Sequence, residues 1–171
     1  MQAAIGRLHY FWTMPPFKRE KVHDLEVARV QIQKYCAYQE RCQFEVETRL
    51  RAMGIAYQAQ EDLMAELISD GFLSEARFAE TFVRGKHNTK GWGRVKLTYA
   101  LKAKRVPGGL ISQALDEISN ETYQATLKNL LNKSMPWANW EEEQRAYQRM
   151  QRKGYTWDEI QNARLALTTE G

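Results

Sequence analysis

The sequence predicts an all-α protein made of tandem three-helix repeats that form an elongated molecule, and three observations support this. The chain of 171 residues contains only four prolines and ten glycines, which leaves few breaks and argues against a turn-rich β protein. No stretch alternates apolar and polar residues long enough for a strand, whereas apolar residues recur at helical spacing. A short pattern also occurs three times, at residues 50–55, 101–106 and 150–155.

This internal pattern defines the repeats. Each copy has an apolar residue, a basic or polar turn and a second apolar residue, and the copies begin 51 and 49 residues apart. Another apolar residue follows twelve positions later, at Leu67, Ile118 and Leu167. A unit of about 50 residues is near the lower limit for an independent core. We therefore expect neighbouring repeats to pack against one another along the chain.

The N-terminal tail and the first repeat come first along the chain. Residues 1–22 fit no repeat, and we expect a flexible tail. Its aromatic segments, Tyr10–Trp12 and Pro15–Phe17, could instead dock on the first repeat or on a partner. The first repeat spans residues 23–70, with helices expected at 24–38, 44–53 and 60–69.

The second repeat spans residues 71–119. Ser74 is a suitable N-cap for its first helix, which we expect to end near Asn88 because Gly91 and Gly93 follow. The second helix runs through residues 95–101. Pro107 suits the first turn of the third helix, which carries apolar residues over 110–118.

The third repeat spans residues 120–171. Two start signals, Asn139 with Glu142 and Thr156 with Glu159, predict its later helices. We expect at least two of its three tryptophans to form a small core. They are Trp137, Trp140 and Trp157.

The turn after each middle helix should contain a left-handed residue, usually glycine. Gly54 and Gly154 fit this expectation in the first and third repeats. Arg105 stands at the equivalent position of the second repeat and departs from it.

Positive charge is concentrated in the second repeat. Residues 77–105 contain nine lysines and arginines and a single acid, Glu80, for a net charge of +8. The whole chain is only +4, so the rest of the chain is −4. Basic side chains on a solvated helix face are usually balanced by acids, and these are not. We therefore favour a binding surface over a solvated helix face. Its candidate residues are Arg84, Lys86, Lys90, Trp92, Arg94, Lys96, Lys102, Lys104 and Arg105.

The turn Gly91–Gly93 leads into a helix N-terminus, where free backbone N–H groups could receive a phosphate or a carboxylate. Trp92 could stack on a ligand or anchor in a pocket. It could equally pack between helices, with the glycines merely permitting the turn.

No catalytic, metal or cofactor site is evident in the sequence. The three histidines lie in unrelated contexts, and no phosphate-binding loop or nucleophile motif occurs. Cys36 and Cys42 lack the further ligands of a zinc module and are expected to be reduced thiols. No apolar run approaches the length of a membrane span, and the N-terminus lacks the apolar core of a signal peptide. We therefore expect a cytoplasmic protein that is not an enzyme and contacts no membrane.

Residues 71–106 resemble the central repeat of the RecX family, which regulates the bacterial RecA recombinase. The segment 71–80 (GFLSEARFAE) is similar to the start of that repeat. The segment 91–97 (GWGRVKL) is similar to its Gly-Tyr-Gly motif, with Trp92 as the aromatic residue. Residues 104–106 (KRV) stand where the family has Lys-Gly-Ile, so Arg105 replaces the glycine.

The resemblance implies a curved array of three-helix repeats that binds the RecA filament. It also implies inhibition of RecA ATP hydrolysis, strand exchange and the co-protease function behind the SOS response. The basic second repeat could contact either RecA or single- or double-stranded DNA. Two alternatives stay open: a free-standing DNA-binding helical module, and a helical-repeat adaptor for another protein.

Overall fold

The computed structural model describes residues 24–169, which fold into helices joined by short turns and confirm the all-α prediction. The predicted tail, residues 1–22, lies outside the described residues. The helices are α1 (Leu25–Tyr38), α2 (Gln43–Ala52), α3 (Tyr57–Ser69), α4 (Glu75–Lys90), α5 (Arg94–Ala103), α6 (Gly108–Asp116), α7 (Asn120–Asn132), α8 (Trp140–Lys153) and α9 (Trp157–Thr169).

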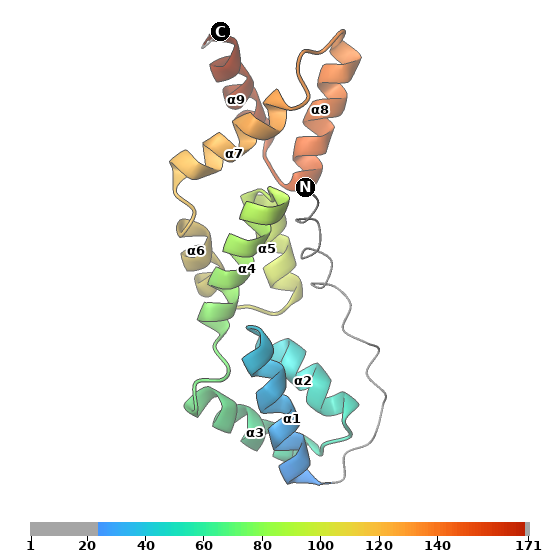
Figure 1. Ribbon diagram of the computed structural model, residues 1–171, viewed down its shortest axis with the longest axis vertical. Helices are drawn as coiled ribbons and strands as arrows, with labels where there is room; N and C mark the ends of the chain where they lie inside the picture. The colour runs from blue at the N-terminus through green and yellow to red at the C-terminus, as the bar shows by residue number, and fades with distance from the viewer. Residues whose placement is uncertain (1–23, 170–171) are drawn as a thin grey trace, which may run out of the picture.

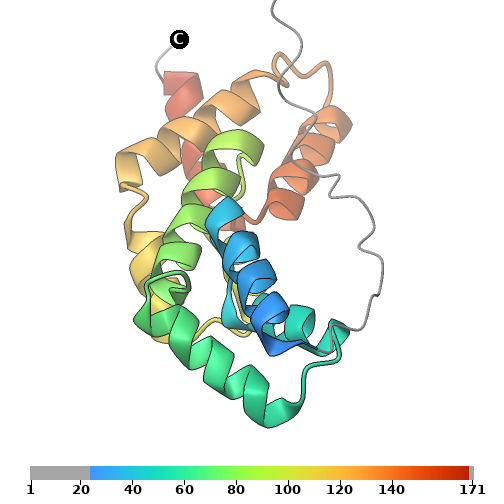
Figure 2. The ribbon, with the colours of Figure 1, turned by 60° about the horizontal axis from the view of Figure 1, so that its bottom comes forward.

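The helices follow one another in groups of three along an elongated, curved molecule. Helices α1–α3 lie at one end, α4–α6 in the middle and α7–α9 at the other end (Figures 1 and 2). The middle helix of each group, α2, α5 or α8, lies toward the same side of the molecule in Figure 1. One surface therefore runs past all three groups along these middle helices.

The turn after each middle helix has the same geometry in all three repeats. The apolar residue that follows the turn donates its backbone N–H to the carbonyl five positions earlier, from Ile55 to Leu50, Val106 to Leu101 and Tyr155 to Met150, at 3.2 Å in each case. This bond is the one that closes a helix with a left-handed residue beyond its end. The left-handed residues are Gly54, Arg105 and Gly154, with φ of 80°, 61° and 95°.

Arg105 therefore adopts the glycine conformation in spite of its side chain. The left-handed region costs a residue with a Cβ atom roughly 1 kcal/mol. The side chain of Arg105 contacts the first repeat, as described below, and these contacts oppose the strain. Arg105 thus replaces the usual glycine, and the turn keeps the same geometry as in the other two repeats.

Three predicted helix starts are confirmed by their caps, whereas the helix predicted to begin at residue 60 begins at Tyr57, and Pro107 caps α6 instead of lying in its first turn. Ser74 accepts a hydrogen bond from the backbone N–H of Arg77, and Asn139 accepts one from Glu142. Thr156 and Glu159 exchange hydrogen bonds as a capping box. The first helix of the second repeat continues to Lys90, two residues past the predicted end near Asn88, because Gly91 supplies the left-handed residue that closes it.

The buried apolar residues between positions 24 and 169 form two cores rather than three. One lies among α1–α3 and includes Ile32, Leu50 and Leu67. The other is continuous through α4–α9 and includes Leu97 and Leu127, and it also receives Cys42 from the first repeat. The second and third repeats therefore share one apolar interior, whereas the first repeat mostly has its own.

Both cysteines are buried and unpaired, as expected of reduced thiols. Burial raises the pKa of Cys36 and of Cys42 to about 11. None of the helices between residues 24 and 169 has the length and apolar character needed to cross a membrane.

Candidate functional site

The nine candidate residues occupy the C-terminal half of α4, the turn Gly91–Gly93, helix α5 and the turn after it. They do not share one face. Arg84 and Lys86 are two positions apart on α4, which turns them about 200° from each other around the helix. Arg84 is exposed, whereas Lys86 lies against Phe82 and Trp92.

The turn Gly91–Gly93 is in backbone contact with the third repeat. The N–H of Gly93 donates to the carbonyl of Lys153 at 2.8 Å, and the N–H of Val95 donates to that of Gly154 at 3.2 Å. Between them, the N–H of Arg94 donates to the hydroxyl of Tyr123 at 3.1 Å.

The expectation that these N–H groups receive a phosphate or a carboxylate is therefore wrong. An anion-binding helix N-terminus needs free N–H groups, and the first ones of α5 are already bonded to the third repeat. The two segments approach closely because each has a glycine at the contact, Gly93 in one and Gly154 in the other. A Cβ atom on Gly93 would lie only 2.8 Å from the backbone N of Tyr155, so a larger residue would prevent the contact.

Trp92 both packs and presents a surface. Its ring is partly buried against the core and meets the ring of Phe82 edge-on, with centroids 6.3 Å apart. The ammonium groups of Lys96 and Lys86 lie 4.6 and 5.5 Å from its centroid. These are cation–π distances, so Trp92 helps to hold two cations at the junction of the second and third repeats.

His87 lies behind Trp92 and is almost fully buried. Its Nδ1 is 3.0 Å from the carbonyl oxygen of Trp92, and Nε2 is 3.2 Å from the hydroxyl of Thr126 on α7. A carbonyl can only accept, so Nδ1 carries a hydrogen. The ring also stacks on Tyr123. His87 is a structural residue that joins α4 to α7.

Arg94 and Lys96 bind carbonyl groups at helix ends. Arg94 donates to the carbonyl of Ile118 at 3.3 Å, and its guanidinium lies 4.3 Å from the centre of the Tyr123 ring. Lys96 donates to the carbonyl of Arg152, near the end of α8, at 3.1 Å. Cations are favourable near helix C-termini, so both residues stabilise the packing of α5 in addition to adding charge.

The third repeat returns the same kind of contact. Lys153 donates from its ammonium to the carbonyl of Lys90, the last residue of α4, at 2.7 Å. Burial lowers the pKa of Lys153, and the positive charges of Lys96 and Lys90 lower it further. We refer to Lys86, Lys90, Trp92, Lys96 and Lys153 as the junction cluster.

Sequence reasoning missed Lys153 because the search for charge stopped at Arg105. The repeat pattern indicates Lys153 as a candidate, because it occupies in the third repeat the place that Lys104 occupies in the second. Both lie at the C-terminal end of a middle helix, Lys153 as its last residue and Lys104 just past it, and both reach toward a neighbouring repeat.

The other end of α5 binds the first repeat through ion pairs. Lys104 pairs with Glu45, and Arg105 pairs with Glu47 at 3.7 Å. The guanidinium of Arg105 also lies 4.5 Å from the centre of the Phe44 ring. Lys104 and Arg105 thus have acidic partners that the charge count over residues 77–105 overlooked, because those acids lie on α2.

Arg77 follows the same rule and pairs with Glu40 at 3.0 Å. The first repeat therefore supplies acids to three of the nine cations counted in the second. The net charge of +8 overstates the free charge of this surface.

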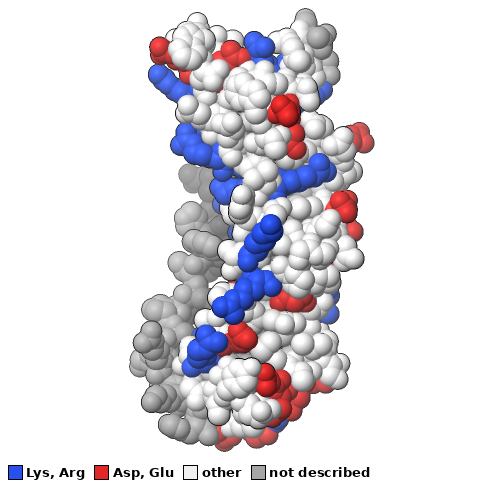
Figure 3. Space-filling model, turned by 180° about the vertical axis from the view of Figure 1, so that it is seen from behind, with Lys and Arg blue, Asp and Glu red and all other residues white. Residues whose placement is uncertain are grey.

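Three candidate cations are both exposed and without an acidic partner among residues 24–169. They are Arg84, Lys90 and Lys102. On the face opposite to that of Figure 1, Lys and Arg side chains are spread along the molecule instead of gathering in one patch (Figure 3). A ligand that uses these charges would have to extend along the molecule.

The prediction of a tryptophan-rich core in the third repeat is wrong. Trp140 is 69% exposed and Trp157 is 47% exposed. Trp137 is partly buried and meets Tyr147 edge-on. Tyr123, Leu127 and Ile160 fill the interior instead, so the tryptophans lie around it.

No group of three or more His, Cys, Asp or Glu side chains in the described part of the chain is arranged to hold a metal ion.

Comparison with known proteins identifies the family. Residues 74–115 match the family model described as RecX, second three-helix domain. Over 123 residues the chain is 31% identical to Regulatory protein RecX of Amycolatopsis mediterranei, and the match covers 70% of each protein. The chain belongs to the RecX family.

Other RecX proteins match at similar levels. Regulatory protein RecX of Bacillus licheniformis is 29% identical over 133 residues, which cover 75% of this chain and 51% of that protein. The chain thus spans only about half the length of this relative. These relatives are named as regulatory proteins.

Two solved RecX structures share the fold. RecX from Lactobacillus salivarius superposes with a TM-score of 0.77 at 21% identity, covering 85% of this chain and 97% of that one. A second crystal structure, of regulatory protein RecX, gives a TM-score of 0.73 at 20% identity, covering 82% of this chain and 72% of that one. Similarity at this level of identity supports the three-helix repeats and the elongated arrangement.

Proposed function

We propose that this protein is a non-enzymatic, cytoplasmic regulator of the RecA recombinase. It binds the RecA–DNA filament and lowers its ATP hydrolysis, strand exchange and SOS co-protease activity, and so acts in DNA recombination and repair. The observation that carries the proposal is the 31% identity to a regulatory protein RecX over most of both chains.

The surface supports a filament as the ligand. A RecA filament repeats the same charged surface many times, and this molecule offers three repeats in a row with cations along its length. Several weak contacts on one chain add up to a much stronger attachment than any one of them provides. Binding through Arg84, Lys90 and Lys102 fits either the DNA phosphates or acidic RecA residues.

The test is ATP hydrolysis by the cognate RecA on single-stranded DNA, titrated with this protein at fixed moderate salt. We expect inhibition at less than one molecule per RecA if the protein acts at filament ends or promotes disassembly. Inhibition only near saturation would indicate coating of the filament.

A matched pair of variants connects the inhibition to the surface. Lys90→Glu with Lys102→Glu reverses two exposed charges and should raise the protein concentration needed for inhibition at least tenfold. Lys34→Glu reverses an exposed charge on α1 and should have little effect. Unchanged ATP hydrolysis with folded wild-type protein would remove the proposal.

The free-standing DNA-binding module is tested by measuring binding to duplex DNA in the absence of RecA. That alternative predicts tight binding to duplex DNA with a sequence preference. Binding that is weak, independent of sequence and abolished by salt would exclude it.

A further inference from the structure

Helix α5 carries an exposed stripe that neither the fold nor the junction cluster uses. Val95, Tyr99 and Lys102 are spaced i, i+4 and i+7, so they lie on one side of the helix. Val95 is 41% exposed, Tyr99 is 70% exposed, and Lys102 is exposed as well. The stripe combines an aromatic ring with an unpaired cation.

The ring of Tyr99 has no structural role among the described residues. Its hydroxyl makes no hydrogen bond there, and its ring contacts no other ring or cation. The buried Tyr123 behaves differently, because its hydroxyl accepts a hydrogen bond from the N–H of Arg94 and donates one to the carboxylate of Glu159. An exposed aromatic ring that the fold does not need is typical of a binding surface.

The charge of α5 points to an anionic ligand. Among the nine helices that the structure describes, α5 alone contains no acidic residue, while it carries Arg94, Lys96 and Lys102. Arg94 and Lys96 bind carbonyl groups, which leaves their positive charge uncompensated. A negatively charged ligand therefore meets no acid on this helix.

The stripe is a property of the central repeat. The positions equivalent to Tyr99 by the repeat spacing are Thr48 on α2 and Gln148 on α8, and both are exposed. Neither has a ring. At this position of the middle helices, only the second repeat therefore carries an aromatic ring.

We propose that the face of α5 formed by Val95, Tyr99 and Lys102 binds single-stranded nucleic acid, with an unpaired base stacked on the Tyr99 ring and a phosphate near Lys102. Every base has a flat face that can stack on an aromatic side chain, so the contact requires no particular sequence. In a duplex, both faces of a base are covered by its neighbours, which leaves only the phosphates for Lys102. This inference deepens the proposed function, because it assigns the single strand of the filament to this surface.

The test is binding of a fluorescently labelled oligothymidylate, measured by anisotropy at fixed moderate salt without RecA. Loss of one stacked base is expected to weaken binding by about 5- to 150-fold. We expect this loss for Tyr99→Ala, while Tyr99→Phe, which keeps the ring, should stay within about twofold of the wild type. Both changes are at an exposed position, and circular dichroism should show both variants folded.

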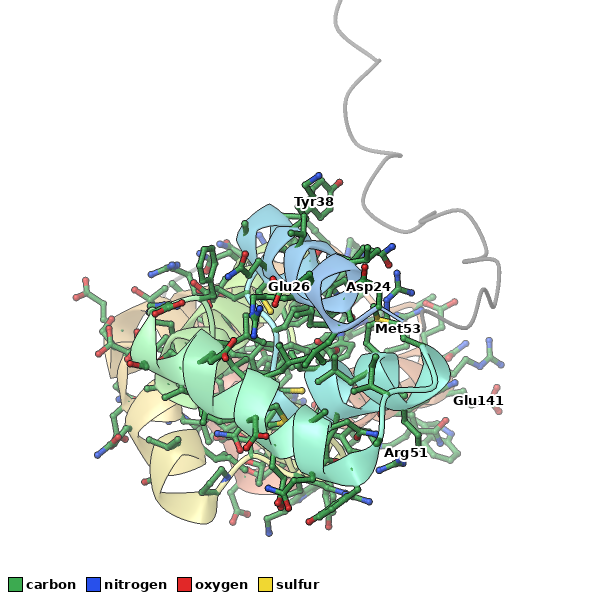
Figure 4. All side chains as sticks on the ribbon, turned by 90° about the horizontal axis from the view of Figure 1, so that it is seen from below. Asp24, Glu26, Tyr38, Arg51, Met53 and Glu141 are labelled. Atoms are coloured by element: carbon green, nitrogen blue, oxygen red, sulfur yellow. The ribbon has the colours of Figure 1, made fainter. Side chains whose placement is uncertain are left out.

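Tyr38 provides a matched control. It is 69% exposed on α1 and projects away from the first repeat (Figure 4). Tyr38→Ala removes the same side chain with the same exposure and should leave the affinity for oligothymidylate unchanged.

A duplex of the same length separates stacking from charge. Tyr99→Ala should change the affinity for the duplex by less than about twofold, because no base is free to stack. Lys102→Ala should weaken binding to both ligands and make the salt dependence less steep by about one phosphate contact.

Two outcomes would overturn the inference. One is an unchanged affinity for oligothymidylate in Tyr99→Ala, with or without a loss of binding to RecA; a loss of RecA binding alone would assign the stripe to a protein surface. The other is an equal loss on single strand and duplex. Neither outcome depends on RecA inhibition by the wild type, so failure here is distinct from failure of the proposed function.

Discussion

At the scale of single residues, Gly93 and Gly154 allow the second and third repeats to meet through their backbones. A Cβ atom on Gly154 would lie 3.0 Å from the Cα of Lys96, and one on Gly93 would meet the backbone of Gly154 and Tyr155. Backbone atoms cannot move aside as a flexible side chain can. Gly93 and Val95 can donate their N–H groups to the carbonyls of Lys153 and Gly154 because neither Gly93 nor Gly154 has a side chain.

We expect Gly93→Ala to lower the free energy of unfolding by about 1–3 kcal/mol, the usual cost of forcing extra volume into a packed site. Gly85→Ala is the control, because Gly85 lies inside α4 and a Cβ atom there meets nothing within 4 Å. That change should raise stability by up to about 1 kcal/mol, since alanine favours a helix interior. Urea unfolding of both variants measures the difference. A Gly93→Ala variant as stable as the wild type would show that the backbone contact between Gly93 and Gly154 can relax at no cost.

At the scale of the helices, α5 uses its cations for two purposes. Arg94 and Lys96 bind carbonyls close to the third repeat, and Lys104, just past the helix, pairs with α2. Lys102 has no such contact and is exposed. The same residue type on one short segment thus serves packing at some positions and is available for binding at another.

This division predicts opposite effects for two lysines of α5. Lys96→Ala should lower the free energy of unfolding by about 1 kcal/mol, because it removes a cross-repeat hydrogen bond. Lys102→Ala should change it by less than about 0.5 kcal/mol and should weaken inhibition of RecA. Urea unfolding and the RecA ATP hydrolysis assay measure the two effects. If Lys96→Ala instead weakened inhibition of RecA and Lys102→Ala lowered the free energy of unfolding, the binding surface would lie at Lys96 in the junction cluster.

The sequence was sufficient for the local structure of these elements and insufficient for the candidate site. Caps at Ser74 and Thr156 depend on residues three positions apart, so they could be read directly. Pairing of Lys104 with Glu45 joins residues 59 positions apart, and a count along the chain cannot detect it. The exposure of Trp140 likewise depends on how other helices fill the core.

At the scale of the whole molecule, the three repeats do not have three equal interiors. The prediction of repeats that pack on one another is confirmed by the fold, but the second and third share a continuous core. Contacts between the first and second repeats include ion pairs at Arg77, Lys104 and Arg105. Spacing in the sequence could identify the repeats but not this unequal sharing, because each repeat has similar apolar positions.

We therefore expect α1–α3 to lose protection from hydrogen exchange at a lower urea concentration than α4–α9, since smaller cores open more easily. Salt should enlarge the difference by screening the exposed ion pairs. Native-state hydrogen exchange followed by mass spectrometry measures protection helix by helix. Loss of protection in all nine described helices at one concentration, or in the second repeat before the third, would contradict this expectation.

The contact between Gly93 and Gly154 also limits which parts of this chain can be exchanged with those of other proteins. A third repeat transplanted from another RecX protein would dock in the same way only if it carried a glycine equivalent to Gly154. A join near residue 73 crosses side-chain contacts, namely three ion pairs and the packing of Cys42, and side chains adapt to small changes of shape. A join near residue 119 separates backbone atoms that do not adapt. The interchangeable part of this protein is therefore the stretch 74–169 as a whole.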